Sequence, residues 1–464
     1  MGIYQPWDRL TECAVGSTYP PEFYKEIKNG KIRYYMEKIA QETCEDLDRY
    51  CSLLRGLGVK VIRAEISDDI EDHTCAIPHG SVTEKIRLPV PPPLHICRQM
   101  GRIGERFFMS SWGMETLKGE YITDRRNLHR DYVLEEHSMV GKPISIYKLA
   151  QCVDFPKPDF ETTFFPWNPL VKHLEDKGVE ILYDRYINTS CTLQVGKDLY
   201  FNMQNMLNSE NRPIFKKKLE ELFPDRRCHL LDLEGHTTKT VTIVKPGLLI
   251  TRKNKRLYQN TFPDWEIIQS RKMPNHLQIK QKVDRSYRRY SHGWWIPNND
   301  QTSHEEIENF LKGWYEDTKG KNKYLKNLYL FSQDLVVVDG NNVIGPPLNN
   351  INKMSIDYIK TYGINYHECH MRHLPVLINT GLDGITMPIE RESSEMETLF
   401  PDDHNPFMIG MNKHKSKTYT HIDSKDNDAI DIDETLTEKM NEPVVGVTTE
   451  LTLKPHQGHR GTGK

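Results

Sequence analysis

A helix pattern stands directly between two strand patterns near the start of the chain, and this order constrains the fold more than any other feature. The segment LTECAVGS (10–17) predicts a strand, residues 34–56 predict a helix that ends at Gly56 and Gly58, and VKVIRAEI (59–66) predicts a second strand. Strands that alternate with a helix are typical of α/β proteins, so we expect that fold class.

A second unit of this kind occurs late in the chain. Residues 328–341 predict two strands, residues 349–363 predict a helix that ends at Gly363, and residues 364–370 predict a further strand. Similar units at both ends suggest internal pseudo-symmetry, although the sequence contains no strong repeat.

A hairpin is predicted over residues 233–253, with two strands joined at Lys245, Pro246 and Gly247. Proline sets the backbone angle of a turn in advance and glycine tolerates a positive φ, so this turn has a physical cause. His236 stands just before the first strand. Two interpretations stay open for it: a catalytic base at the mouth of a site, or a polar residue at a strand end.

Composition and charge exclude several function classes. The chain has 464 residues, a formal net charge of −3 and a pI near 6.7, whereas a dedicated nucleic-acid binder usually has a basic excess. No apolar run approaches the roughly 20 residues of a membrane helix, and the start has no secretory signal. The 9 cysteines form no C-x-x-C pair, which is typical of a reduced, cytoplasmic protein. We therefore expect no nucleic-acid and no membrane partner.

The last part of the chain has a different composition from the rest. Residues 415–464 are first acidic and then rich in glycine, histidine and lysine, with few aromatic residues. Such a segment cannot bury enough apolar surface to fold alone. We expect one domain over residues 1–414 and a disordered or loosely attached tail over residues 415–464.

Several motifs along the chain resemble one family. They are PWDRLTECAVGS (6–17), the helix and strand of residues 36–66, NTSCTLQVGKDLYF (188–201), the hairpin of residues 235–255, and LVVVDGNNVIGPP with YIKTYGI (335–364). In this order they resemble the glycine (arginine) amidinotransferases over most of residues 4–392. The resemblance implies a pentein fold, which is a five-bladed ββαβ propeller with pseudo-fivefold symmetry and an active site on its central axis.

The resemblance also implies a chemistry. In this family a cysteine thiolate attacks the guanidinium carbon of arginine, a histidine moves protons, and carboxylates hold the guanidinium. It implies a guanidino or amino-acid ligand, no cofactor, and a homodimer as one option. The family histidine falls on His236, and a basic family residue after the hairpin falls on Lys255 or Arg256.

The other family positions carry different residues in this chain. Thr238 stands where the family has an aspartate, and Asn188 and Cys191 stand where it has two acids. The position of the nucleophile falls on Asp383 when the residues are counted without gaps, and on Met387 when the glycines are aligned. Loss of such a nucleophile costs on the order of a million-fold in turnover.

Three interpretations follow from these differences. The chain is a pseudoenzyme with a binding or structural role, or it is an enzyme on an arginine-like guanidino compound with altered catalytic residues. In the second case Asp383 acts as a base, or holds a cation, with His236 as its partner. In the third interpretation the nucleophile has moved, and Cys191 pairs with His236.

The segment YHECHMRH (366–373) resembles a metal cluster in composition only. On a strand, His367 and Cys369 lie on one face and His370 on the other. Zinc sites usually need four ligands, and a fourth is not evident in the sequence. We therefore expect no metal.

Overall fold

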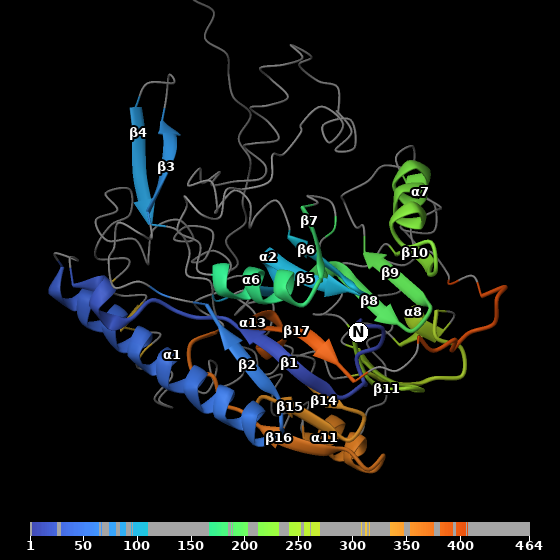
Figure 1. Ribbon diagram of the computed structural model, residues 1–464. Helices are drawn as coiled ribbons and strands as arrows, with labels where there is room; N and C mark the ends of the chain where they lie inside the picture. The colour runs from blue at the N-terminus through green and yellow to red at the C-terminus, as the bar shows by residue number, and fades with distance from the viewer. Residues whose placement is uncertain are drawn as a thin grey trace, which may run out of the picture. The chain divides into compact units, whose positions relative to one another are not determined.

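The computed structural model shows a mixed α/β chain (Figure 1). The described residues are 2–25, 29–64, 66, 74–79, 84–89, 94, 96–109, 167–183, 187, 189–202, 212–231, 241–251, 255–259, 261–269, 308, 311–312, 315, 335–347, 353–374, 381–392, 396–404 and 406. The α/β class predicted from the sequence is confirmed. No helix among these residues is both long and apolar enough to cross a bilayer.

Five three-stranded sheets occur in the described residues. In each sheet the first strand runs antiparallel to the middle strand, and the third strand runs parallel to it. The sheets are β17 (Thr386–Arg391), β1 (Leu10–Val15) and β2 (Lys60–Arg63); β5 (Met100–Ile103), β6 (Arg106–Met109) and β7 (Glu180–Tyr183); β8 (Thr192–Val195), β9 (Asp198–Asn202) and β10 (Arg227–Leu231); β11 (Val241–Lys245), β12 (Leu248–Thr251) and β13 (Glu266–Gln269); and β14 (Val336–Asp339), β15 (Asn342–Gly345) and β16 (Asn365–Glu368).

A helix stands between the two parallel strands of every one of these sheets, because a parallel connection needs a crossover. The crossover helices are α1 (Gly30–Gly56), α6 (Asn168–Asp176), α7 (Arg212–Leu222), α8 (Arg256–Gln259) and α11 (Lys353–Lys360). The other described elements are a hairpin of β3 (Thr74–His79) and β4 (Glu84–Pro89), the short helices α2 (Ile96–Gln99) and α13 (Leu382–Ile385), and the 3-10 turns η1 (Pro21–Tyr24) and η3 (Thr189–Cys191).

The first predicted strand–helix–strand unit and the predicted hairpin are present. In the second unit the helix and the last strand are present, but residues 335–341 contain one strand, β14, and residues 328–334 lie outside the described residues. Helix α1 begins at Gly30, four residues before the predicted start, because the Asn29 side chain accepts hydrogen bonds from the amides of Lys31 and Ile32. The hairpin of β11 and β12 turns at Gly247, whose φ of 79° is a conformation that glycine adopts without strain. Strand β16 ends at Glu368, so it is shorter than the predicted strand of residues 364–370.

The first strands of successive sheets lie against one another. Between β17 and β5, Arg102 donates to the carbonyl of Ile389 at 2.6 Å, and between β5 and β8, Gln194 donates to the carbonyl of Arg102 at 2.9 Å. Side chains of β8 and β11 share one apolar cluster, and those of β11 and β14 share another. Arg391 of β17 then donates to the carbonyl of Val337 in β14 at 2.9 Å, so the fifth sheet contacts the first.

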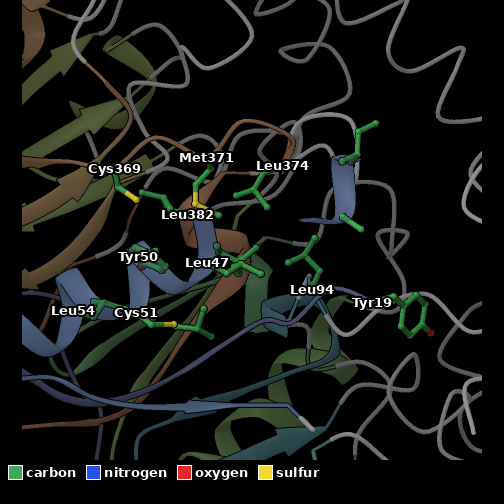
Figure 2. Close-up of a cluster of buried hydrophobic side chains, with 14 of the residues drawn as sticks. Tyr19, Leu47, Tyr50, Cys51, Leu54, Leu94, Cys369, Met371, Leu374 and Leu382 are labelled. Atoms are coloured by element: carbon green, nitrogen blue, oxygen red, sulfur yellow. The ribbon is translucent and has the colours of Figure 1, made fainter. Parts of the chain in front are cut away.

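The first sheet joins opposite ends of the chain. Its strands β1 and β17 lie side by side although nearly the whole described chain separates them in sequence (Figure 1). The face of α1 that carries Leu47 and Tyr50 packs against this sheet and against residues of the ranges 369–374 and 382–385. Figure 2 shows these two side chains near Leu382 of α13, with Met371 and Leu374 in the same buried cluster. Burial of this apolar surface holds α13 in place beside β1.

Candidate functional site

The sequence-predicted site residues are only partly placed. Asp383 lies in α13 and is half-buried. Cys191 ends η3, where its backbone is described. The side chain of Cys191 and the residues Asn188, His236 and Thr238 lie outside the described part of the structure, so their predicted roles stay predictions.

Two further predicted residues, Lys255 and Arg256, follow β12. Both are exposed, and Arg256 begins helix α8. The backbone amide of Lys255 donates to the side chain of Gln269 at 3.2 Å, which fixes the start of the helix.

The two positions on which the sequence comparison places the nucleophile have different surroundings. Met387 lies on β17 with 1% of its surface exposed, in an apolar cluster with Ala14 and Phe107. Asp383 precedes β17 in a turn and is half-buried. A polar reaction or a charged ligand needs polar groups within reach, so Asp383 is the better candidate.

The glycine of the AVGS motif brings β1 close to α13. The amide of Gly16 donates to the carbonyl of Ile385 at 2.9 Å. A Cβ atom at this position would lie 2.0 Å from the carbonyl oxygen of Leu94, a distance that no side chain tolerates. The motif glycine is thus required because three segments of backbone meet there, at the end of β1, before α2 and at α13.

A second glycine brings η3 against β5. A Cβ atom at Gly101 would lie 2.4 Å from the hydroxyl oxygen of Thr189. The same hydroxyl donates to the carbonyl of Cys97 in α2 at 3.3 Å. The segment that carries Cys191 is therefore packed against α2.

Cys97 stands between the two predicted site segments, and sequence reasoning missed it. Its Sγ lies 3.1 Å from the carbonyl oxygen of Asp383 and 2.9 Å from that of Thr386. Burial raises the pKa of this thiol, and the nearby charge of Asp383 raises it further. Cys97 is thus a protonated donor and not a thiolate nucleophile. No motif surrounds it, so only the fold identifies it.

The other described thiols are also protonated. Burial is the first cause that raises the pKa of each, and it brings the pKa of Cys228 and of Cys369 to about 12. The remaining thiols with a raised pKa are Cys13, Cys44 and Cys51. An activated thiolate needs the opposite shift. A nucleophilic cysteine must therefore be sought among the three whose side chains lie outside the described residues, Cys75, Cys152 and Cys191.

A buried chain of hydroxyl groups links α1 to the same turn. The hydroxyl of Thr386 donates to the carbonyl of Leu382 at 2.7 Å and lies 2.6 Å from the hydroxyl of Tyr50. Since Thr386 has a single hydroxyl hydrogen, Tyr50 is the donor of the second bond. Burial raises the pKa of Tyr50 well above its ordinary value, which keeps that hydrogen in place.

The histidine-rich segment has partners of another kind. His367 lies 3.1 Å from the amide oxygen of Asn342, whereas His373 lies 2.9 Å from a carboxylate oxygen of Glu42 in α1. Cys369 is buried in the apolar cluster beside α1. Among the described residues, no three histidine, cysteine or acidic side chains are grouped as metal ligands.

Comparison with known proteins finds similar solved structures at low sequence identity. No protein-family model and no curated protein matches the chain. Similar solved structures include an amidinotransferase of Microseira wollei from the saxitoxin biosynthetic pathway, with TM-score 0.48 and 12% identity over 86% of this chain and 99% of that chain. The inosamine-phosphate amidinotransferase of Streptomyces griseus has TM-score 0.48 and 13% identity over 86% of this chain and 98% of its own.

A third similar structure is a dimethylarginine dimethylaminohydrolase of Pseudomonas aeruginosa in complex with citrulline. Its TM-score is 0.41, with 9% identity over 82% of this chain and 100% of that chain. The similar structures thus include amidinotransferases, the family that the sequence motifs resemble. Such a similarity does not fix a chemistry, which has to be argued from the residues of this chain.

Proposed function

We propose that this chain is an amidinotransferase-like pentein protein that binds a guanidino or amino-acid ligand and has lost amidino transfer through a thiolate. Five sheets of one strand order support the propeller part of this proposal. Their first strands adjoin in chain order, and the fifth sheet contacts the first. In this proposal residues 1–414 form the propeller and residues 415–464 are a tail outside it.

One feature supports the functional part. Counted without gaps, the position of the family nucleophile falls on the carboxylic acid Asp383, which lies in the turn that leads into β17. The thiol beside it, that of Cys97, has a raised pKa because of burial and of Asp383 itself. A carboxylate at this position attracts a guanidinium or ammonium group through charge-assisted hydrogen bonds, but it cannot perform the thiolate step.

The first experiment measures binding. We expect arginine to bind the full chain in a calorimetric titration, and Asp383→Asn to weaken that binding at least about tenfold, since a hydrogen bond to a charged group contributes about 1.5–3 kcal/mol. The matched control is Asp357→Asn on α11, where the carboxylate is exposed. Equal affinity in the wild type and in Asp383→Asn contradicts the proposal.

The second experiment measures turnover. The full chain is mixed with arginine and glycine, and ornithine is quantified against a sample without protein. We expect no difference between the two samples. Ornithine formation above background would overturn the proposed loss of transfer and favour an enzyme with altered residues.

One observation favours that alternative enzyme. The η3 turn that ends at Cys191 is packed against α2, and α2 in turn contacts the Asp383 turn through Cys97. If the nucleophile had moved to Cys191, only helix α2 would separate its segment from the Asp383 turn. If Cys191 is activated, a thiol-reactive probe labels it faster at neutral pH than the other cysteines, and Cys191→Ala abolishes ornithine formation. Equal labelling rates exclude this alternative.

A further inference from the structure

We infer that Cys97 is a positioning residue: its thiol fixes the turn of residues 382–386, and this turn sets the position of the Asp383 carboxylate toward a cationic ligand. The inference rests on the proposed function, because Asp383 is the group to be positioned. It goes beyond the family resemblance, which assigns no role to this cysteine.

The first step of the argument is the set of hydrogen bonds in the turn. Four carbonyl groups between residues 382 and 386 each have a donor. The carbonyl of Leu382 accepts from Thr386 at 2.7 Å, and that of Ile385 accepts from the amide of Gly16 at 2.9 Å. The remaining two carbonyls, of Asp383 and Thr386, share the single S–H hydrogen of Cys97 in a three-centre bond, with Sγ···O distances of 3.1 and 2.9 Å. Cys97 thus holds both sides of the turn.

The second step is the chemical nature of this donor. The thiol is neutral, since burial and Asp383 keep it protonated. It therefore fixes the backbone of Asp383 without placing a positive charge beside the carboxylate. An arginine or lysine in its place would form an ion pair and compete with a cationic ligand. All four bonds to the turn are accepted by backbone carbonyls, so they hold its main chain.

The third step is that Cys97 is itself held. Its own carbonyl accepts from Thr189 of η3 at 3.3 Å, where Gly101 permits the close approach. Cys97 therefore lies between η3 and α13 and contacts both. Binding groups are effective only when their neighbours hold them within about 0.5 Å of the productive position. A residue that links both predicted site segments is suited to this task.

The test uses three variants of the full chain. Cys97→Ala removes the donor, Cys97→Ser replaces it by a hydroxyl, and Cys228→Ala is the matched control. Cys228 is equally a buried thiol, with 3% exposed, but it belongs to the apolar cluster around α7 and β10 and not to the α13 turn. Each variant is studied by hydrogen exchange of the peptide that covers residues 381–387 and by calorimetric titration with arginine from pH 4 to 8.

We expect Cys97→Ala to speed exchange in this peptide and to weaken arginine binding about tenfold, with a shifted acid midpoint of binding. Cys97→Ser should restore most of both properties. Cys228→Ala should change neither, although it lowers the melting temperature. If Cys97→Ala lowers the melting temperature but leaves exchange, affinity and the acid midpoint at wild-type values, the residue has a merely structural role and the inference is wrong.

The outcomes for the two proposals are separable. Failure of the wild type to bind arginine overturns the proposed function and, with it, the ligand-directed part of this inference. The exchange measurement still decides whether Cys97 holds the turn, because it needs no ligand. Binding by the wild type together with normal exchange in Cys97→Ala overturns the positioning role alone.

Discussion

Two buried polar regions of this chain are built from opposite kinds of hydrogen bond. In the third sheet the carboxylate of Asp198, with 0% of its side chain exposed, lies 2.6 Å from both Arg227 and His229. In the turn of residues 382–386 the donors are a thiol, two hydroxyl groups and a backbone amide, all of them neutral. The first region is ionic, and the second is not.

This difference separates a region held by charged groups from a turn held by neutral donors. The Asp198 carboxylate is compensated inside the fold, because a buried charge without a partner costs several kcal/mol. In the α13 turn the hydrogen bonds go to backbone carbonyls and to the hydroxyl of Thr386, and none of their donors carries a charge. We therefore expect the ionic regions to control how stability depends on pH, and the neutral turn to control ligand binding.

The largest expected effect tests the ionic region. Asp198→Asn keeps the shape of the side chain but leaves Arg227 and His229 without their shared carboxylate. Breaking a buried pair in this way costs about 3–5 kcal/mol of unfolding free energy, to be measured by urea denaturation at pH 7.

The matched control for Asp198 is Asp402→Asn. Asp402 lies 3.8 Å from the same Arg227, but its side chain is 86% exposed. A surface pair of this kind contributes about 0–1 kcal/mol. If both variants lose the same free energy, burial does not distinguish the two carboxylates, and the comparison between the regions fails.

The second-largest expected effect tests the neutral turn of residues 382–386. Tyr50→Phe removes the donor to the buried hydroxyl of Thr386 and should cost about 1–3 kcal/mol. Because burial raises the pKa of Tyr50 well above its ordinary value, this group does not titrate near neutrality. We expect the same loss at pH 5 and at pH 8 in urea denaturation. A loss that changes with pH between these values would show that the turn is coupled to a charge.

A second ionic region predicts a dependence on pH. Burial would raise the pKa of Glu12, but hydrogen bonds from Lys177, Lys60 and His173 lower it to about 2. A carboxyl whose pKa is lowered on folding adds stability above its ordinary pKa of 4.5, and this contribution is lost as the pH falls toward 2. We expect about 1–2 kcal/mol, less than the full shift implies, because the side chains of Lys60 and Lys177 are 61% and 35% exposed and solvent screens them.

The measurement for Glu12 compares two acid titrations of stability. Between pH 4.5 and 2.5 the wild type should lose more unfolding free energy than Glu12→Gln, because the variant has no carboxyl at this position to protonate. At pH 6 the variant should be the less stable protein. Parallel titration curves for the two proteins would mean that Glu12 gains nothing from its cationic partners.

Much of the fold follows from local sequence, and the reasons are visible in single residues. The β11–β12 hairpin was predictable because Pro246 and Gly247 determine its turn. The start of α1 was missed because the capping role of Asn29 depends on its position relative to the amides of Lys31 and Ile32. The pairing of β17 with β1 joins residues too distant for any periodicity to reveal.

The candidate site was less predictable from the sequence. The family resemblance pointed to Asp383 and Met387 equally, and only burial separates them, since Met387 lies in an apolar cluster. Cys97 carried no motif at all. Its contact with the carbonyl of Asp383 spans 286 residues of sequence, so it appears only when the first two sheets are in place. Side-chain contacts of this range are a property of the fold.

The smallest expected effect concerns His404, which lies at the edge of the ionic region around Asp198. His404 lies 3.2 Å from the hydroxyl of Tyr200 and stacks on Phe400. Burial lowers the pKa of this histidine, and its charged neighbours act in both directions: Asp198 raises the pKa, whereas His229 and Arg227 lower it. Here the carboxylate of Asp198 is already compensated, so it does not reverse the effect of burial.

A histidine whose pKa is lowered on folding binds fewer protons in the folded state, so its contribution to stability is lost as the pH falls below 6.5. Between pH 6.5 and 5 we expect the wild type to lose less than about 1 kcal/mol of unfolding free energy through His404, and His404→Gln to lack this loss. The effect is small because the side chain is partly exposed and solvent screens its charge. Urea denaturation across this range measures it. A wild-type loss that persists unchanged in His404→Gln would show that this pH dependence does not come from His404, and the predicted contribution of this histidine would be wrong.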